Sequence, residues 1–258
     1  MKVTWEAAGA TDVGRVRAHN EDAFLIDAPR GLFMVADGMG GHAAGEIASA
    51  IASEAVGAAM RQGVDAGLRT EMLAEAMVES FHAAHRSIVN YSLAKPETRG
   101  MGTTLTVLVM CDDGSFRLGH IGDSRCYVLR DGELTQLSRD HTWVQREVDE
   151  GRLTDRGSRR HHLAHMLTRA LGADSLDQPD VYAGTLLPGD LVMLCSDGLT
   201  GMLTDRMLRR ILVRGGELAE RVAELVIGAN ERGGRDNITA VLVRVLDADE
   251  PADADAAK

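Results

Sequence analysis

The sequence predicts an α+β domain in which a central β sandwich of two mostly antiparallel sheets is flanked by pairs of helices, a four-layer αββα arrangement. Three observations predict this class. Many strand-like runs follow one another too closely for helical crossovers, so neighbouring strands are expected to pair as hairpins. The order of segments is strands, helix pair, strands, helix pair, strand. Hydrophobic residues make up 45% of the 258 residues, which is enough for a sizeable core.

The N-terminal part supplies three strands and the first helix pair. Strand-like segments occupy 3–9 and 23–27, and the run Leu32–Ala36 is apolar and bounded by glycines. Small, helix-favouring residues fill 42–60, and apolar side chains recur at helical spacing over 68–94. We therefore expect two successive helices after the third strand.

A meander of strands follows the helix pair. β-Branched residues over 102–110 predict a strand that turns back into 115–121. An Asp-Gly turn then separates two further strands, 125–130 and 133–137, and is a strong hairpin signal. These short connections argue against a doubly wound parallel sheet.

The C-terminal part begins with a short helix and an arginine-rich polar loop at 151–160, which we expect to be mobile. After the loop, strand-like and helical patterns alternate. The elements expected here are a helix at 141–150, strands at 181–187 and 191–195, helices at 205–213 and 218–229, and a strand at 238–245.

Composition bounds the domain organisation. No linker divides the chain, so we expect one domain at 1–246 and a disordered tail at 247–258, which carries five acids and one lysine. The formal net charge of −11 argues against a nucleic-acid partner or an anionic membrane surface. No apolar run is long enough for a membrane segment, and no signal-peptide layout is present, so we expect a soluble, cytoplasmic monomer.

Cysteine and lysine usage excludes several classes. Cys111, Cys126 and Cys195 are far apart and lie in or beside strand-like runs, which favours core thiols over disulfides or a zinc knuckle. Only three lysines are present, and none lies in a suitable glycine-rich loop or strand. A P-loop NTPase or a protein kinase needs such a lysine on its phosphates. A response-regulator phosphoacceptor would need a parallel fold.

Four aspartates, Asp37, Asp123, Asp197 and Asp236, stand at strand ends or in turns. Any one of them could be a turn former or a helix cap. If all four converge, their carboxylates repel one another unless cations neutralise them. Oxygen ligands favour Mg²⁺ or Mn²⁺ over zinc, and a pair of such ions would activate water against a phosphate. Arg17 is the candidate clamp for that phosphate, because guanidinium binds phosphate oxygens in a bidentate fork.

The ordered motifs around these residues resemble the type 2C metal-dependent Ser/Thr protein phosphatases of the PPM family, and most closely their bacterial branch. The resemblance covers about residues 3–245, so it is far more specific than any single motif. It rests on Arg17–Asp22, Ala36–His42, Gly102–Thr104, Gly122–Arg125, Leu167–Ala170, Ser196–Leu199 and Asp236–Asn237.

The resemblance implies a binuclear metal centre. Asp37 would bridge two Mn²⁺ or Mg²⁺ ions, and Asp197 and Asp236 would complete the shell of one of them. The carbonyl group of Gly38 would bind the other ion. The water that bridges the two ions would attack phosphorus directly, without a covalent phosphoenzyme.

The resemblance also assigns supporting roles. Glu21 and Asp22 would hold the waters of the second ion, and Asn237 would belong to the same outer shell. Arg17 would grip the substrate phosphate. The general acid is unassigned, because Met39 occupies the position where eukaryotic relatives have a histidine, and the nearest histidine is His42.

A third, weaker metal site would be formed by Asp123 with Asp197, beside a flap at about 141–180. Some bacterial relatives add a flap Ser or Asn to that site, where this chain has His165. The spacing of His161 and His165 could also suit a metal on a helix. With no Glu or Cys to complete a zinc set, a solvated flap is the favoured interpretation of both histidines.

The function implied is Mn²⁺- or Mg²⁺-dependent hydrolysis of phosphoserine and phosphothreonine in proteins. The expected partners are phosphorylated proteins, including a cognate Ser/Thr kinase. The alternative is a catalytically inactive pseudophosphatase that only binds a phosphoprotein. Such a protein is expected to have lost at least one metal aspartate, and all of them are present.

Overall fold

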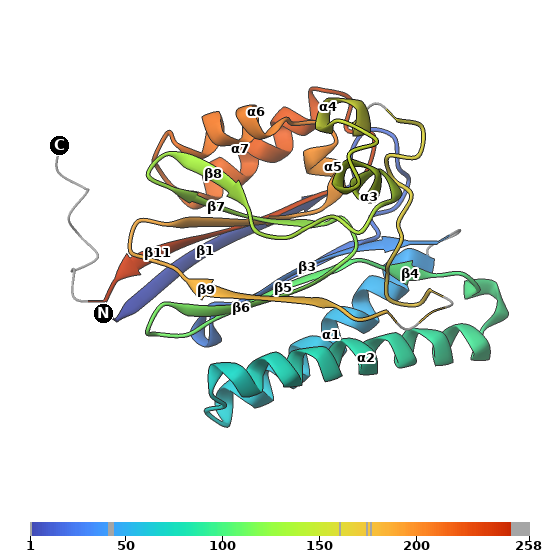
Figure 1. Cartoon of the computed structure of the whole chain (residues 1–258), viewed down its shortest axis with the longest axis horizontal. Coiled ribbons are helices and arrows are strands. Elements are labelled where there is room, and N and C mark those ends of the chain that lie inside the picture. Colours follow the sequence, from blue (N-terminus) through green and yellow to red (C-terminus); the bar gives the residue numbers. More distant parts are fainter. Residues whose placement is uncertain (1, 41–43, 160, 174, 176, 249–258) are drawn as a thin grey trace.

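A computed structural model of the chain describes residues 2–40, 44–159, 161–173, 175 and 177–248. Within these residues two antiparallel sheets lie face to face (Figure 1). The first sheet consists, in spatial order, of β1 (Val3–Asp12), β11 (Ile238–Asp247), β10 (Leu191–Cys195), β7 (Arg125–Arg130) and β8 (Glu133–Gln136). The second consists of β2 (Asp22–Asp27), β3 (Leu32–Met39), β5 (Leu105–Met110), β6 (Ser115–Ile121) and β9 (Asp180–Thr185), and β4 (Gly102–Thr103) pairs with β3.

Helices cover both outer faces of the sandwich (Figure 1). The second sheet packs against α1 (Ala44–Asp65) and α2 (Thr70–Ala94), and the first packs against α6 (Asp205–Leu212) and α7 (Leu218–Asn230). The predicted αββα fold is therefore confirmed. Among the helices of the described residues, none combines the length and the apolar character needed to cross a membrane.

The position of the central strands explains why their sequences are continuously apolar. In β3, Leu32 and Met34 pack toward α1 and α2, whereas Phe33 and Val35 pack between the sheets. Because both faces of the strand are buried, no polar alternation is present. Each fully buried side chain of this size contributes roughly 1.5–3 kcal/mol through loss of apolar surface to water. β10 follows the same rule, with Val192 among the residues between the sheets.

Most elements lie where the sequence predicts them, although β1 runs to Asp12 instead of residue 9 and α1 to Asp65 instead of residue 60. Three further differences lie in the C-terminal half. The loop predicted at 151–160 contains a short helix, α4 (Asp155–Ser158). Asp197 begins a short helix, α5 (Asp197–Thr200), where only a turn was expected. The last strand runs to Asp247, which pairs with Val3, so the tail prediction is wrong at its first residue. Residues 249–258 lie outside the described residues.

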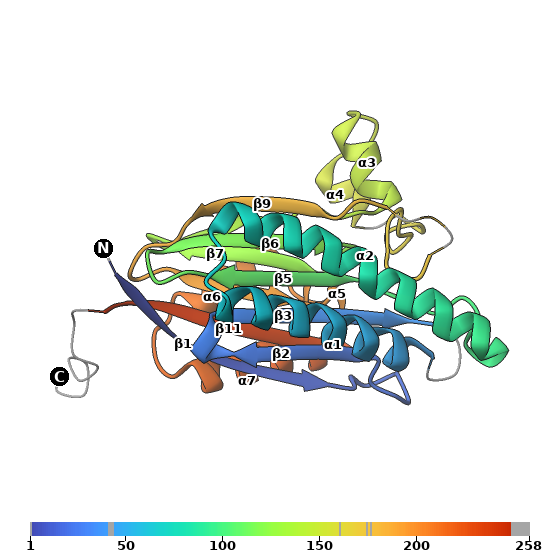
Figure 2. The ribbon, with the colours of Figure 1, turned by 90° about the horizontal axis from the view of Figure 1, so that it is seen from below.

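The segment 141–180 is packed against the body near its C-terminal end, where Leu171 pairs with Thr103 and joins the core beneath α1 and α2. It carries α3 (Trp143–Asp149) and α4, which project from the body at one end of the sandwich (Figure 2). Cys126 and Cys195 are buried, free thiols, as predicted, and Cys111 is free and partly buried. The prediction that residues 1–246 form one domain stays a prediction.

Candidate metal centre

The four strand-end aspartates come together in one cavity of about 190 Å³. Asp37 lies near the end of β3, Asp123 in the turn between β6 and β7, Asp197 at the start of α5, and Asp236 just before β11. These positions belong to both sheets, and they meet at one end of the sandwich. The cavity is lined by Arg17, Glu21, Asp37, Gly38, Met39, Gly40, Thr104, Asp123, His165, Leu167, Asp197 and Asp236.

The backbone of Asp37 is fixed by Thr103, in β4, and by Thr104, which lies between β4 and β5. The Asp37 N–H donates to Thr104 Oγ1 at 3.0 Å, and the Thr104 N–H donates to the Asp37 carbonyl at 2.9 Å. Thr103 Oγ1 donates to the same carbonyl at 3.0 Å. Neither threonine was a predicted site residue. In the sequence, only their place in the motif Gly102–Thr104 pointed to them. Their contacts with Asp37 could not be predicted, because they join positions more than sixty residues apart.

Gly38 is required by close backbone packing. A Cβ atom at this position would lie 2.2 Å from the carbonyl oxygen of Gly45 and 2.5 Å from that of Glu21. The Gly38 N–H donates to the Glu21 carbonyl at 3.1 Å. The absence of a side chain thus lets β3, the start of α1 and the residue before β2 meet at the cavity wall.

Asp22 lies behind the cavity and does not line it. It pairs with Asp37 across β2 and β3, and its Oδ2 accepts from Ser196 Oγ at 2.8 Å and from Thr239 Oγ1 at 2.6 Å. Its Oδ1 is buried without a hydrogen-bond partner among the described residues. Burial, with added repulsion from Asp197, raises the pKa of Asp22 to about 7.

Burial and mutual repulsion also govern the cavity carboxylates. Burial raises the pKa of Asp37, and Asp22 and Asp197 raise it further. Burial raises the pKa of Asp123, to which Asp197 again contributes. Such a set of carboxylates is costly unless cations compensate its charge. Together with the orphaned Asp22 oxygen, this donor set fits hard divalent cations such as Mg²⁺ or Mn²⁺.

Arg17 reaches the cavity from the loop between β1 and β2. Its Nη2 donates to Asp236 Oδ2 at 2.7 Å, and its side chain is 49% exposed. The hydrogen bond that Arg17 donates to Asp236 raises the pKa of Arg17, so the guanidinium remains charged. Arg17 therefore places a positive charge beside the cavity acids, and its role as a phosphate clamp stays a prediction.

Asn237 connects the cavity to the loop that carries Arg17 and Glu21. Its Oδ1 accepts from the Glu21 N–H at 2.8 Å, and its Nδ2 donates to the carbonyls of Val13 at 3.0 Å and His19 at 2.9 Å. Both ends of the loop are thereby attached to the residue that follows Asp236. Asn237 therefore positions the backbone of the loop between β1 and β2, a role that the sequence did not reveal.

His165 is the main addition that the structure makes to the site. Its Nδ1 lies 3.0 Å from Asp197 Oδ2, although its side chain is 75% exposed. His161 instead stacks on Trp143, with ring centroids 5.0 Å apart. The solvated-flap interpretation therefore holds for the exposure of His165, but this side chain also borders the cavity. His42 lies outside the described residues.

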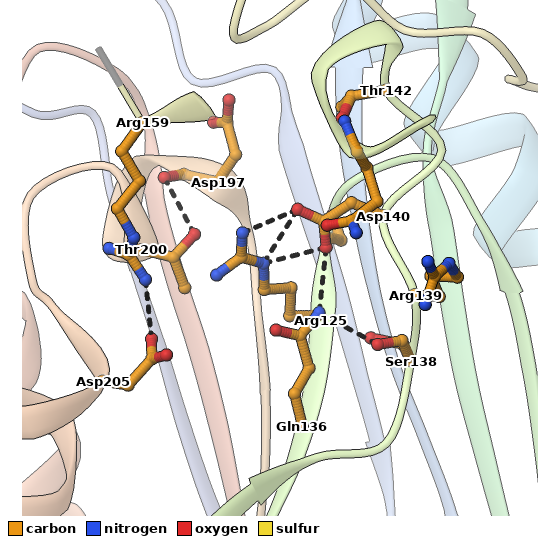
Figure 3. Close-up of polar contacts among 12 residues, drawn as sticks. Arg125, Gln136, Ser138, Arg139, Asp140, Thr142, Arg159, Asp197, Thr200 and Asp205 are labelled. Atoms are coloured by element: carbon orange, nitrogen blue, oxygen red, sulfur yellow. Dashed lines mark hydrogen bonds and ion pairs between the residues drawn. The ribbon is translucent and has the colours of Figure 1, made fainter. Parts of the chain in front are cut away.

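A partly buried ion pair joins Arg125, at the start of β7, to Asp140 (Figure 3). Arg125 Nη2 donates to Asp140 Oδ2 at 2.6 Å, its Nε donates to the same carboxylate, and its Nη1 donates to Tyr127 Oη at 2.9 Å. Gln136 also donates to Asp140. These bonds join β7 and β8 to Asp140, the residue that precedes the segment 141–180.

The fold indicates the class of the protein, because it is similar to that of the PPM Ser-Thr phosphatase MsPP from Mycobacterium smegmatis, with a TM-score of 0.81 and 34% identity over 94% of this chain and 98% of that one. One comparable structure is the catalytic domain of the serine/threonine protein phosphatase PstP in complex with two manganese ions. It is 38% identical to this chain with a TM-score of 0.83, and the alignment covers 95% of this chain and 100% of that one.

The chain belongs to the protein phosphatase 2C family, whose sequence profile matches residues 14–243. It is 40% identical over 244 residues to the serine/threonine protein phosphatase PstP of Mycobacterium tuberculosis, covering 94% of this chain but only 45% of that relative. It is 34% identical over 236 residues to the serine/threonine phosphatase stp of Listeria monocytogenes, covering 90% of this chain and 93% of the relative.

Proposed function

We propose that this chain hydrolyses phosphoserine and phosphothreonine in proteins with Mn²⁺ or Mg²⁺ as cofactor, by direct attack of water on phosphorus. The observation that carries the proposal is the convergence of four carboxylates and one arginine on a single cavity. The names of the relatives and the manganese complex of PstP support it.

The proposed ligands of the two principal cations are Asp37, Asp197, Asp236 and the carbonyl group of Gly38. Cations bound there would supply positive charge and an activated water. Glu21 and Asp22 would hold outer-shell waters, since Glu21 lines the cavity and Asp22 lies directly behind Asp37. Asp123 with Asp197 would form the third site.

Arg17 would bind and orient the substrate phosphate. Its ion pair with Asp236 holds the guanidinium at the rim, and further N–H groups remain for phosphate oxygens. Asn237 would keep the Arg17 loop in register with the cavity through its three hydrogen bonds. The short segment Asp236–Asn237 would thereby position both the Arg17 side chain, which binds substrate, and one of the proposed metal ligands, Asp236 itself.

The cysteines support a mechanism without a thiol nucleophile. Burial raises the pKa of Cys195 to about 12 and raises the pKa of Cys126 still further. Burial likewise raises the pKa of Cys111. Because the thiolate is the reactive form, these thiols are inert at neutral pH. No covalent ³²P is therefore expected on enzyme quenched during turnover with labelled phosphoprotein.

The direct test is hydrolysis of p-nitrophenyl phosphate and a phosphothreonine peptide with and without Mn²⁺. We expect Mn²⁺ to accelerate the wild type, whereas Asp37→Asn stays at the metal-free rate. Asp131→Asn, the same chemical change in the β7–β8 turn, is the control and should behave like the wild type. Equal rates of wild type and Asp37→Asn under both conditions would favour the pseudophosphatase alternative.

The phosphoprotein substrates are proposed to include a Ser/Thr kinase whose action this enzyme reverses. An Asp197→Asn variant should hydrolyse such a substrate slowly, because a proposed metal ligand is lost. It should still bind the phosphorylated substrate, because Arg17 remains. Co-purification of a phosphorylated kinase with this variant is the expected result. Recovery of the same kinase without its phosphate would argue against this choice of partner.

A further inference from the structure

One cluster of possible metal ligands contains a nitrogen donor. Ligand atoms of Asp123, His165 and Asp197 all lie within 4.8 Å of one another. The aspartates come from strand ends of the two sheets, and His165 comes from the segment between α4 and β9. The cluster therefore joins the body of the fold to the segment 141–180.

The condition of Asp123 is a second, independent indication of a ligand. This residue is only 8% exposed, and it lines the cavity. Among the described residues its carboxylate has no hydrogen-bond or ion-pair partner, unlike that of Asp197, which is paired with His165. The carboxylate of this largely buried residue opens onto the cavity, where repulsion from Asp197 adds to the cost of its charge, and a bound cation would lower that cost.

We propose that Asp123, Asp197 and His165 form a site that prefers a transition-metal ion of the zinc type to Mg²⁺. An imidazole nitrogen suits Zn²⁺ and its neighbours, whereas Mg²⁺ prefers an all-oxygen shell. Three protein ligands with an open fourth position match a common zinc arrangement. The proposal deepens the proposed function and rests on it through the shared residue Asp197.

The nitrogen ligand has a structural consequence. The peptide N–H of Trp143 donates to the carbonyl of Met166 at 2.8 Å, so the residue beside His165 is attached to the start of α3. A cation held by His165 and the two aspartates would therefore tie the segment 141–180 to the body. Hydrogen exchange of this segment should slow when Zn²⁺ binds.

The test uses the full chain with histidine labelled with ¹⁵N, first saturated with Mg²⁺ and then titrated with Zn²⁺. In the wild type, the ring-nitrogen resonances of His165 should shift as Zn²⁺ is added. His165→Ser should weaken binding at this site by about 10-fold or more, measured by calorimetry, and abolish the slowing of hydrogen exchange. His162→Ser, which removes a neighbouring histidine that does not line the cavity, is the matched control and should bind as the wild type does.

Two results would overturn the proposal. One is a His165 resonance that does not move while Zn²⁺ binds, and the other is equal Zn²⁺ affinity in His165→Ser and wild type. Phosphatase activity with Mn²⁺, measured on the same preparations, separates this failure from that of the proposed function. If the wild type is active with Mn²⁺ but the His165 resonance does not shift, only the site that contains His165 is refuted. If the wild type shows no Mn²⁺-dependent activity, the proposed function is refuted.

Discussion

At the scale of single residues, the site depends on charged groups held in surroundings that would otherwise disfavour them. Asp37 and Asp123 are buried beside other acids, and Arg17 provides the compensating charge at the rim through Asp236. Removal of any one of them changes the balance of charge for the others. The clearest test on a single side chain is therefore at Arg17, which is exposed enough to be replaced without disturbing the core.

Arg17→Ala should lower kcat/KM for a phosphopeptide by about 100- to 1000-fold, because one preorganised donor to the phosphate is lost. Arg17→Lys should recover only part of this loss, since an ammonium group cannot form the bidentate fork. Arg15→Ala removes a charge from the same loop without touching the cavity lining and should retain most activity. Equal kinetics for Arg17→Ala and Arg15→Ala would refute the clamp.

At the scale of elements, the positions of the acids follow from strand ends, which periodicity and turn signals predict well. The sequence therefore predicted β3, β10 and β11 and their aspartates with boundary errors of three residues or fewer. It could not predict contacts that depend on distant pairing. The bonds of Thr104 to Asp37, of Arg125 to Asp140 and of His165 to Asp197 are visible only once the chain is folded.

The loop between β1 and β2 provides a prediction at this scale. Asn237→Ala removes three hydrogen bonds from the loop, and we expect a loss of about 1–3 kcal/mol in the free energy of unfolding. Urea denaturation measures this change. The Glu21 amide should also exchange faster with solvent, and kcat/KM should fall because Arg17 is less well positioned. Unchanged exchange at Glu21 would show that Asn237 does not hold the loop.

At the scale of the whole molecule, a buried histidine makes stability depend on pH. His120 has both ring nitrogens engaged, with Thr106 Oγ1 at 2.9 Å and the Arg139 carbonyl at 3.0 Å. Because a carbonyl only accepts, Nε2 carries the proton, and the ring is neutral. Burial, with a smaller contribution from neighbouring His141, lowers the pKa of His120 to about 3.

The sign of the effect follows from this lowered pKa. Below its ordinary pKa of 6.5, the unfolded state binds a proton on His120 that the folded state does not. Its contribution to stability is therefore complete above pH 6.5 and is lost as pH falls toward 3. Between pH 4 and 6, the free energy of unfolding of the wild type minus that of His120→Gln should rise by about 1.4 kcal/mol per pH unit. Parallel pH curves for the two proteins would contradict this assignment.

The arrangement of the sandwich places residues from both sheets and from the segment 141–180 around one cavity, and the account depends on divalent cations binding there. Diffraction from crystals grown with Mn²⁺, recorded near the manganese absorption edge, tests this most directly. The account predicts two anomalous peaks in the cavity, both in contact with Asp37, with Asp197 and Asp236 bound to one of them. An anomalous map without peaks in this cavity, at Mn²⁺ concentrations that support hydrolysis, would contradict it.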